Sequence, residues 1–186
     1  MHVLSLSGRL PSPPAGNGVR APAPSLKSAD ATFSIHPAKG EFEGYASLFG
    51  VMDLGRDVVM PGAFRETIEK RGASGVRLLW QHDPAQPLGT WTDIAEDQRG
   101  LYVRGALDLD QPKSREALSL MQKGALDGLS IGYRTEIERK DPATGLRRLE
   151  RIDLWEISLV TFPLLPQARV SAVKSMPAAR RIPAFA

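Results

Sequence analysis

Cysteine is absent from the chain, which has 186 residues. Disulfide bonds, a thiol nucleophile and a cysteine-ligated zinc site are therefore excluded. The absence of cysteine also favours an intracellular protein. Because 186 residues provide for one hydrophobic core but not for two, we expect a single domain.

Long apolar segments are also absent. No apolar run approaches the roughly 20 residues that a membrane-spanning helix needs. The first ten residues contain one basic residue, Arg9, and no long apolar stretch follows them. We therefore expect neither a secretory signal nor a membrane partner.

Positive charge is scarce in the central part of the chain. The net charge is +3, but residues 1–30 and 174–186 carry three basic residues each, against one acidic residue in the two segments together. Residues 31–173 hold 18 basic and 20 acidic residues. Because a nucleic-acid-binding domain typically has a basic face on its folded part, we expect no nucleic-acid partner.

The two ends of the chain are rich in residues that oppose regular structure. The first segment contains five prolines, at positions 11, 13, 14, 22 and 24, and neither end has a periodic apolar face. The composition predicts a disordered leader over residues 1–35, a folded domain over 36–174 and a disordered basic tail over 175–186.

Between the ends the pattern predicts mainly β-structure. Alternating or continuous apolar runs predict strands at 41–48, 58–60, 76–81, 88–94, 101–107, 129–138 and 149–160. Two helices are predicted, at 63–70 and from Pro112 to Gly124. An open sheet would expose long apolar edges, so we expect a mainly β (α+β) fold: a closed or nearly closed β-barrel of six to seven strands with peripheral helices.

Histidine is scarce, and only one of the three histidines lies well inside the folded region. His2 lies in the leader and His36 at its margin, whereas His82 follows the apolar run 76–81. The end of a strand is a rigid support from which an imidazole can point into a cleft. The alternative is a turn histidine that forms local hydrogen bonds.

A glycine-flanked serine is the candidate nucleophile. Residues 128–132, Gly-Leu-Ser-Ile-Gly, match the G-x-S-x-G pattern, in which the glycines allow a tight turn that exposes the hydroxyl of Ser130. The α/β-hydrolase fold is disfavoured because a strand-like segment follows the serine and no histidine comes after it. The alternative is a turn serine that opens a strand.

A serine hydroxyl needs a base, and the base needs a third group that orients it. His82 is the candidate base, and Glu156 is the candidate third group because it lies in an otherwise apolar strand, where a charge needs a partner. Strand alternation offers another interpretation, in which Leu154, Glu156 and Ser158 share one solvent-facing side. The alternative acids are Asp153, Asp83 and Asp127.

Five blocks of the sequence, in order, resemble those of the tailed-phage (caudovirus) prohead serine proteases. Residues 80–89 resemble the histidine motif of that family, 127–133 its serine motif, 153–163 its third block, and 43–49 and 61–64 the opening of its domain. The family is similar in fold to the herpesvirus assembly proteases (assemblin-like), which have a triad in the order His, Ser, third residue. The third residue of the herpesvirus enzymes is a histidine. No histidine follows Ser130 here, so an acid must take that place if a triad exists.

The resemblance implies a serine endopeptidase that cleaves scaffold, or the scaffold-like segment of the capsid protein, during procapsid maturation and that processes itself. It implies the major capsid protein and scaffold as partners, a homo-oligomer, and a location in the host cytoplasm inside the assembling procapsid. No cofactor or metal is expected. Residues 166–169 are the candidate source of oxyanion donors. The alternatives are an inactive structural or scaffold protein that keeps the protease fold, and an esterase that uses Ser130 and His82.

Overall fold

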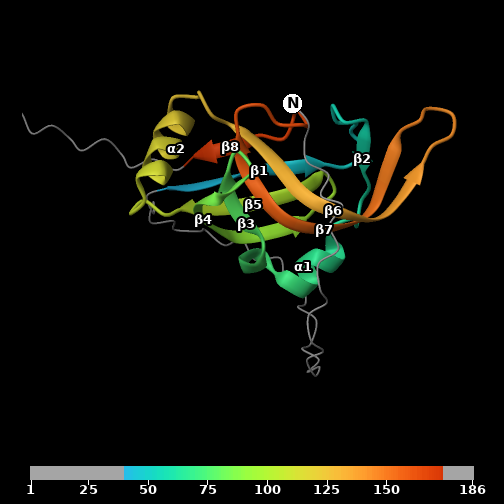
Figure 1. Ribbon diagram of the computed structural model, residues 1–186, viewed down its shortest axis with the longest axis horizontal. Coiled ribbons are helices and arrows are strands. Elements are labelled where there is room, and N and C mark those ends of the chain that lie inside the picture. The colour runs from blue at the N-terminus through green and yellow to red at the C-terminus, as the bar shows by residue number, and fades with distance from the viewer. Residues whose placement is uncertain (1–39, 174–186) are drawn as a thin grey trace, which may run out of the picture. The chain divides into compact units, whose positions relative to one another are not determined.

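The computed structural model describes residues 40–173, so the predicted leader over 1–35 and tail over 175–186 lie outside the described residues. The described part is mainly β-structure with few helices (Figure 1). Its elements are β1 Glu41–Leu48, β2 Asp57–Val59, α1 Arg65–Arg71, the 3-10 helix η1 Ala73–Gly75, β3 Arg77–Trp80, β4 Asp83–Glu96, β5 Gly100–Leu107, α2 Pro112–Gln122, β6 Gly128–Lys140, β7 Arg147–Val160 and β8 Val170–Val173.

One eight-stranded sheet contains all of these strands, in the order β2-β7-β3-β4-β5-β1-β8, with β6 paired to β7. Strand β7 is the centre of the arrangement. It pairs along one edge with β6 in antiparallel fashion, and along the other edge with β2 and β3 in parallel fashion. Figure 1 shows β6 and β7 as a long hairpin that projects beyond the rest of the sheet.

The sheet curls into a half-barrel that is open, so the prediction of a closed or nearly closed barrel of six to seven strands is corrected. Its two ends meet only where the segment before β8 crosses the start of β6. There the Leu129 amide donates to the Ala168 carbonyl at 2.9 Å, and the Val170 amide donates to the Asp127 carbonyl at 2.8 Å. Strand β8 is four residues long and pairs with β1 from there on, so it leaves β6 without a further strand partner in the described part.

The concave side of the sheet holds the hydrophobic core. Phe42 and Trp91 meet edge to face, with ring centroids 5.5 Å apart. Each fully buried side chain of this size stabilises the fold by roughly 1.5–3 kcal/mol. The largest fully buried side chains are Phe42, Phe64, Leu78, Leu88, Leu101, Leu129, Leu149, Ile152, Leu154, Ile157, Leu159 and Val103.

Two helices pack at the margins of the sheet. The hydroxyl of Thr67 in α1 donates to the carbonyl of Ile152 at 2.8 Å, and that of Ser114 in α2 donates to the carbonyl of Leu88 at 2.7 Å.

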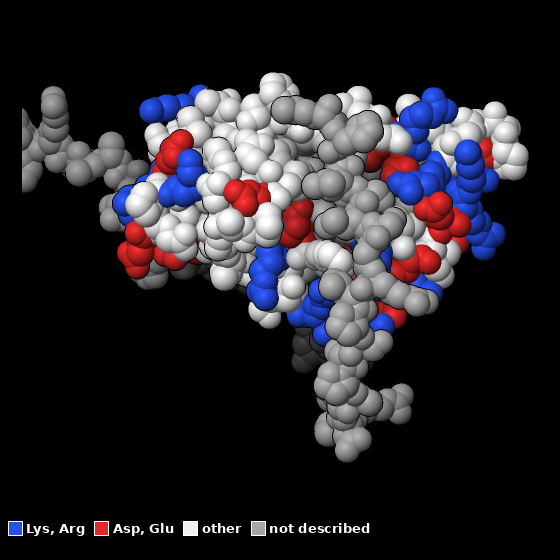
Figure 2. All heavy atoms as spheres, in the orientation of Figure 1, with Lys and Arg blue, Asp and Glu red and all other residues white. Residues whose placement is uncertain are grey.

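Basic and acidic side chains are interspersed over the face that Figure 2 shows. Within residues 40–173, neither helix has the length and apolar character that a membrane span requires.

Candidate active site

Strands β6 and β7 place Ser130 beside two polar residues of β7. In their antiparallel register Ser130 lies opposite Ser158, and Gly132 lies opposite Glu156. Cross-strand partners share a face of the sheet. Ser130, Ser158 and Glu156 therefore lie on one face, while Leu129 points from β6 into the core on the other face.

A β-bulge at Trp155 sets the direction of Glu156. Gly132 pairs with Glu156 and Tyr133 with Leu154, so β7 holds one extra residue between them. Leu154 consequently turns into the core, where it is fully buried, while Glu156 points to the opposite face. The interpretation that Leu154, Glu156 and Ser158 share one face is therefore wrong for Leu154, whereas Glu156 and Ser158 do share a face. Bulges often re-aim side chains in this way beside active sites.

His82 lies in the tight turn that joins β3 to β4. Strand β3 ends at Trp80, which pairs with Asp83, so Gln81 and His82 form a two-residue hairpin turn. Their φ angles are +51° and +62°, and positive φ at both central residues is the requirement of a type I′ turn. The prediction that the strand continues through Gln81 and ends at His82 is corrected accordingly.

The turn is anchored to β7 and to the loop that follows it. The Gln81 amide donates to the Leu159 carbonyl at 2.9 Å. The Gln81 side chain donates to the Thr161 hydroxyl at 2.8 Å and accepts from the Thr161 amide at 3.4 Å. Each left-handed residue costs roughly 1–2 kcal/mol, which these contacts offset.

An imidazole–carboxylate hydrogen bond joins the turn to β7. The Nδ1 atom of His82 lies 2.6 Å from Oε1 of Glu156. The Glu156 side chain is 13% exposed and that of His82 is 37% exposed. An ionised carboxylate only accepts, so a neutral imidazole paired with it carries its proton on Nδ1 and keeps the lone pair of Nε2. This is the state that a general base requires.

Gly132 leaves the space that the Glu156 carboxylate occupies. A Cβ atom at Gly132 would lie 2.0 Å from Oε1 of Glu156. The Glu156 carboxylate therefore lies over Gly132, two residues after Ser130 on β6. Gly132 has no positive φ, so it is required for this close approach and not for the tight turn that the G-x-S-x-G pattern predicts.

The Ser130 hydroxyl belongs to a buried residue but keeps some contact with solvent. The residue as a whole is 8% exposed, and its Oγ atom forms no hydrogen bond within the described part of the chain. The described residues contain no buried side-chain oxygen or nitrogen that lacks a partner, so this unbonded Oγ reaches solvent. Catalytic hydrogen bonds in free enzymes often form only when substrate binds.

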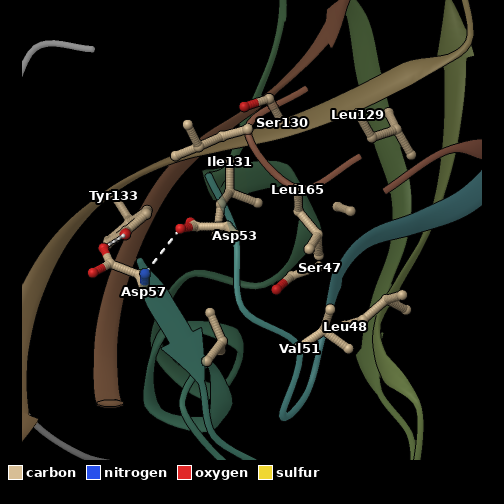
Figure 3. A pocket seen from close by; sticks show the side chains of 13 residues that line it. Ser47, Leu48, Val51, Asp53, Asp57, Leu129, Ser130, Ile131, Tyr133 and Leu165 are labelled. Carbon is tan, nitrogen blue, oxygen red and sulfur yellow. Dashed lines mark hydrogen bonds between the residues drawn. The ribbon is translucent and has the colours of Figure 1, made fainter. Parts of the chain in front are cut away.

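A pocket adjoins Ser130 between β6, the end of β1 and the chain that leads into β2 (Figure 3). Most of its surface is apolar. It is lined by Ala46, Ser47, Leu48, Val51, Asp53, Asp57, Val59, Leu129, Ser130, Ile131, Tyr133, Leu164 and Leu165. It lies beside the candidate nucleophile.

The far end of this pocket is acidic. The Asp57 carboxylate accepts from Nε of Arg147 at 2.7 Å and from the Tyr133 hydroxyl at 3.1 Å, and the Asp57 amide donates to Asp53 at 2.9 Å (Figure 3). Burial, together with the charge of Asp57, raises the pKa of Tyr133 well above its usual value. Burial also raises the pKa of Asp53, and the negative charge of Asp57 acts in the same direction.

The three alternative acids each bind partners other than His82. Asp83 accepts from the Ala85 amide and the Gln86 side chain, Asp153 from Arg71 and the Trp155 indole, and Asp127 from Arg169. Among the sequence-predicted acids, the structure thus brings Glu156 to the imidazole and the other three to different places.

The loop over residues 166–169 runs beside β6 immediately before Ser130. The carbonyl of Ala168 accepts from the Leu129 amide at 2.9 Å, while the Ala168 amide donates to the Leu165 carbonyl at 2.9 Å. The loop is therefore adjacent to the candidate nucleophile, and its role as the source of oxyanion donors stays a prediction.

Sequence reasoning gave no role to Ser158, which contacts both His82 and Glu156. The only signal for it was its spacing two residues after Glu156, which places both on one side of a strand.

Among residues 40–173, no group of three or more His, Cys, Asp or Glu side chains is arranged to hold a metal ion.

Comparisons with known proteins agree on one family. The family described as caudovirus prohead serine protease matches residues 29–181. A prohead protease of Enterobacteria phage HK97 is 34% identical over 157 residues, which cover 82% of this chain and 68% of the relative. A capsid polyprotein of Pseudomonas phage PAJU2 is 32% identical over 126 residues, which cover 62% of this chain and 19% of the polyprotein.

A solved structure shows a similar fold. The KSHV protease in complex with a hexapeptide phosphonate inhibitor superposes with a TM-score of 0.50 at 13% identity, covering 70% of this chain and 63% of that chain. The curled sheet with few helices is therefore an architecture that this chain shares with a herpesvirus protease.

Proposed function

Because the chain belongs to the caudovirus prohead serine protease family and is a serine peptidase, we propose that it is an endopeptidase with Ser130 as nucleophile, His82 as general base and Glu156 as the orienting acid. The observation that carries this assignment is the 2.6 Å contact between Nδ1 of His82 and Glu156, whose carboxylate lies over Gly132. The register of β6 and β7, which sets Ser130 opposite Ser158, supports the assignment of Ser130 to the same site.

The proposed chemistry is acyl transfer. Ser130 Oγ attacks the carbonyl carbon of the scissile peptide while Nε2 of His82 takes the hydroxyl proton. The tetrahedral intermediate collapses, His82 gives the proton to the leaving amine, and water then hydrolyses the acyl-enzyme by the same route. Glu156 holds Nδ1 and stabilises the positive imidazolium that forms during each step.

The substrate is proposed to bind as an extended strand along β6. In the described part of the chain, β6 pairs with β7 alone, so its outer edge beyond Leu129 is open to another strand. Strand addition supplies main-chain hydrogen bonds, and alternate side chains of the peptide enter pockets. The pocket beside Ser130 would receive one of them, and its mainly apolar wall favours an apolar side chain.

The proposed substrates are the scaffold, or the scaffold-like segment of the major capsid protein, and the protease itself. The similarity to a prohead protease and to a capsid polyprotein supports a role in procapsid maturation. The proposal includes a homo-oligomer inside the assembling procapsid in the host cytoplasm, without nucleic acid or membrane as a partner.

A fluorophosphonate probe tests the nucleophile directly. We expect covalent labelling of Ser130, located by peptide mass spectrometry, and loss of labelling in His82→Ala, because the hydroxyl needs its base. Absence of labelling in the intact chain would favour the inactive structural protein. Labelling together with turnover of small esters but not of peptides would favour the esterase.

A further inference from the structure

We propose that Ser158 is a positioning residue that fixes the His82–Glu156 pair in its working geometry. This inference rests on the proposed function of that pair. Ser158 lies in β7 directly opposite Ser130 and is fully buried, whereas its neighbours Ile157 and Leu159 point into the core on the other face. A hydroxyl there is therefore part of the polar face that carries the site.

The Ser158 hydroxyl connects both members of the pair. It donates to Oε2 of Glu156 at 2.6 Å and accepts from the backbone amide of His82 at 3.1 Å. The carboxylate can only accept and the amide can only donate, so the direction of both bonds is determined. The Ser158 side chain thus binds the carboxylate oxygen Oε2 of Glu156 and the backbone amide of His82 at the same time.

The donated bond fixes the rotation of the carboxylate. Oε2 is bound to Ser158, and this leaves Oε1 turned toward Nδ1 of His82 at 2.6 Å. Without the hydroxyl, the carboxylate could rotate about its terminal bond, because that torsion has broad, shallow minima. Ser158 therefore determines which oxygen faces the imidazole.

The accepted bond fixes the position of the base. His82 lies in a turn with φ of +62°, a conformation that surrounding contacts must maintain. Its amide is bound to Ser158. The same hydroxyl therefore sets the separation between the turn and β7, on which the contact between Nδ1 and the carboxylate depends.

The first test measures the tautomer of His82 and does not need activity. In chains labelled with 15N-histidine, the ring-nitrogen shifts at a pH where the ring is neutral distinguish Nδ1–H from Nε2–H, and His82→Gln identifies the signals. We expect Nδ1–H in the wild type and in Ser158→Thr, and a mixture dominated by Nε2–H in Ser158→Ala and Glu156→Gln. An unchanged Nδ1–H population in Ser158→Ala would overturn the proposal.

Ser114→Ala is the matched control. Ser114 is also a fully buried serine whose hydroxyl donates at 2.7 Å, but it lies in α2 and its partner is the carbonyl of Leu88. Its loss should lower the melting temperature about as much as Ser158→Ala while leaving the tautomer and the rate unchanged. If both variants alter the rate equally, the effect of Ser158 is one of general stability.

The second test is a double-mutant cycle on a peptide from the capsid precursor. Ser158→Ala should lower kcat by about 10- to 100-fold with KM changed less than about twofold, which is the loss observed when groups that orient metal-bound histidines are removed. In the Glu156→Gln background the same change should cost less than about twofold, because the acid that it positions is gone. Equal losses in both backgrounds would contradict the proposal.

Failure of the inference and failure of the proposed function give different results. If the wild type cleaves no peptide but Ser158→Ala still loses the Nδ1–H tautomer, the endopeptidase assignment fails and the positioning role stands. If the wild type cleaves and Ser158→Ala keeps both rate and tautomer, the positioning role fails and the endopeptidase assignment stands.

Discussion

The contact between the Glu156 carboxylate and the His82 imidazole depends on a few close contacts between individual atoms. Glu156 lies over Gly132, and its carboxylate is held between His82 and Ser158. Of these contacts, sequence reasoning predicted the one between Glu156 and His82. It could not predict the need for an unsubstituted Gly132, because that need arises from the path of a side chain on a neighbouring strand.

Gly132→Ala should remove most of the activity while keeping the fold. The added Cβ would lie 2.0 Å from Oε1 of Glu156, so the carboxylate must move away from His82. Loss of the orienting acid lowers serine protease rates by up to about 10⁴-fold, and we expect a loss of at least about 100-fold in kcat. The measurement is peptide hydrolysis, with the melting curve as the control for folding. A rate within about threefold of wild type would show that the carboxylate is not needed in this place.

Asp53 should make the stability of the protein depend on pH. Its pKa is raised by burial and by the charge of Asp57, so protonation favours the folded state. The stability that this contributes is present below the unfolded pKa of about 3.9 and is lost as the pH rises through the folded pKa.

Asp53→Asn should therefore raise the melting temperature at pH 7, since an amide keeps the oxygen that accepts from the Asp57 amide but carries no charge. The gain should shrink as the pH falls through the raised pKa of folded Asp53, where the wild-type carboxyl takes up its proton. Thermal melts across this range provide the test. A gain that does not change with pH would exclude titration of Asp53 as its cause.

At the scale of elements, the hairpin turn between β3 and β4 positions the base. Its two residues have positive φ, and Gln81 is fixed through its side chain to Thr161. Gln81→Ala keeps the unfavourable backbone and removes this contact. We expect a loss of stability on the order of 1 kcal/mol and a lower kcat, because His82 is the next residue in the turn.

Gln111→Ala is the control for this change, because its side chain donates to Asp108, outside the residues that form the site. Both variants are compared by denaturant unfolding and by peptide hydrolysis. If Gln81→Ala and Gln111→Ala show the same kcat, the Thr161 contact has no part in positioning His82.

Most elements follow from local sequence, whereas their pairing does not. The strand predicted at 41–48 coincides with β1, and the helix predicted from Pro112 corresponds to α2 over Pro112–Gln122. The start of β4 was predicted five residues late. The segment contains Pro84 and Pro87, and proline is normally a sign against a strand. The bulge at Trp155 appears in the sequence only as a change of phase, with Ile152 and Leu154 buried before it and Ile157 and Leu159 buried after it. A strict period-2 interpretation of this strand does not allow for it.

At the scale of the whole molecule, closure of the barrel depends on contacts between segments far apart in the chain. Residues near Val170 bridge β1 and β6 at one point, and the remaining edge of β6 stays open. The barrel was predicted to close because the apolar strand that contains Ile157 and Leu159 would otherwise have an unpaired edge. In the structure this strand, β7, pairs with β3 on one side and with β6 on the other, so its edges are covered although the barrel is open. The open edge lies on β6, where a substrate strand is proposed to bind.

Self-processing should remove the ends of the chain. Strand β8 ends at Val173, so a cut near Val173-Lys174-Ser175 leaves every described strand complete. An N-terminal cut is expected before about Phe33, where the composition changes. Intact mass of the purified wild type after incubation should show both truncations, and Ser130→Ala should keep its full mass. Full-length chains in both samples would exclude self-processing, and equal truncation in both would indicate a host protease.

The most direct test of the account is cleavage of the capsid precursor by the intact chain. The precursor is co-expressed with the wild type or with Ser130→Ala, and its processed form is measured by mass spectrometry. Removal of one hydroxyl that forms no hydrogen bond within the described residues should leave the fold stable to within about 1 kcal/mol. The account predicts a processed capsid protein with the wild type and an intact precursor with Ser130→Ala. Equal processing by a folded Ser130→Ala protein would contradict the assignment of Ser130 as the nucleophile.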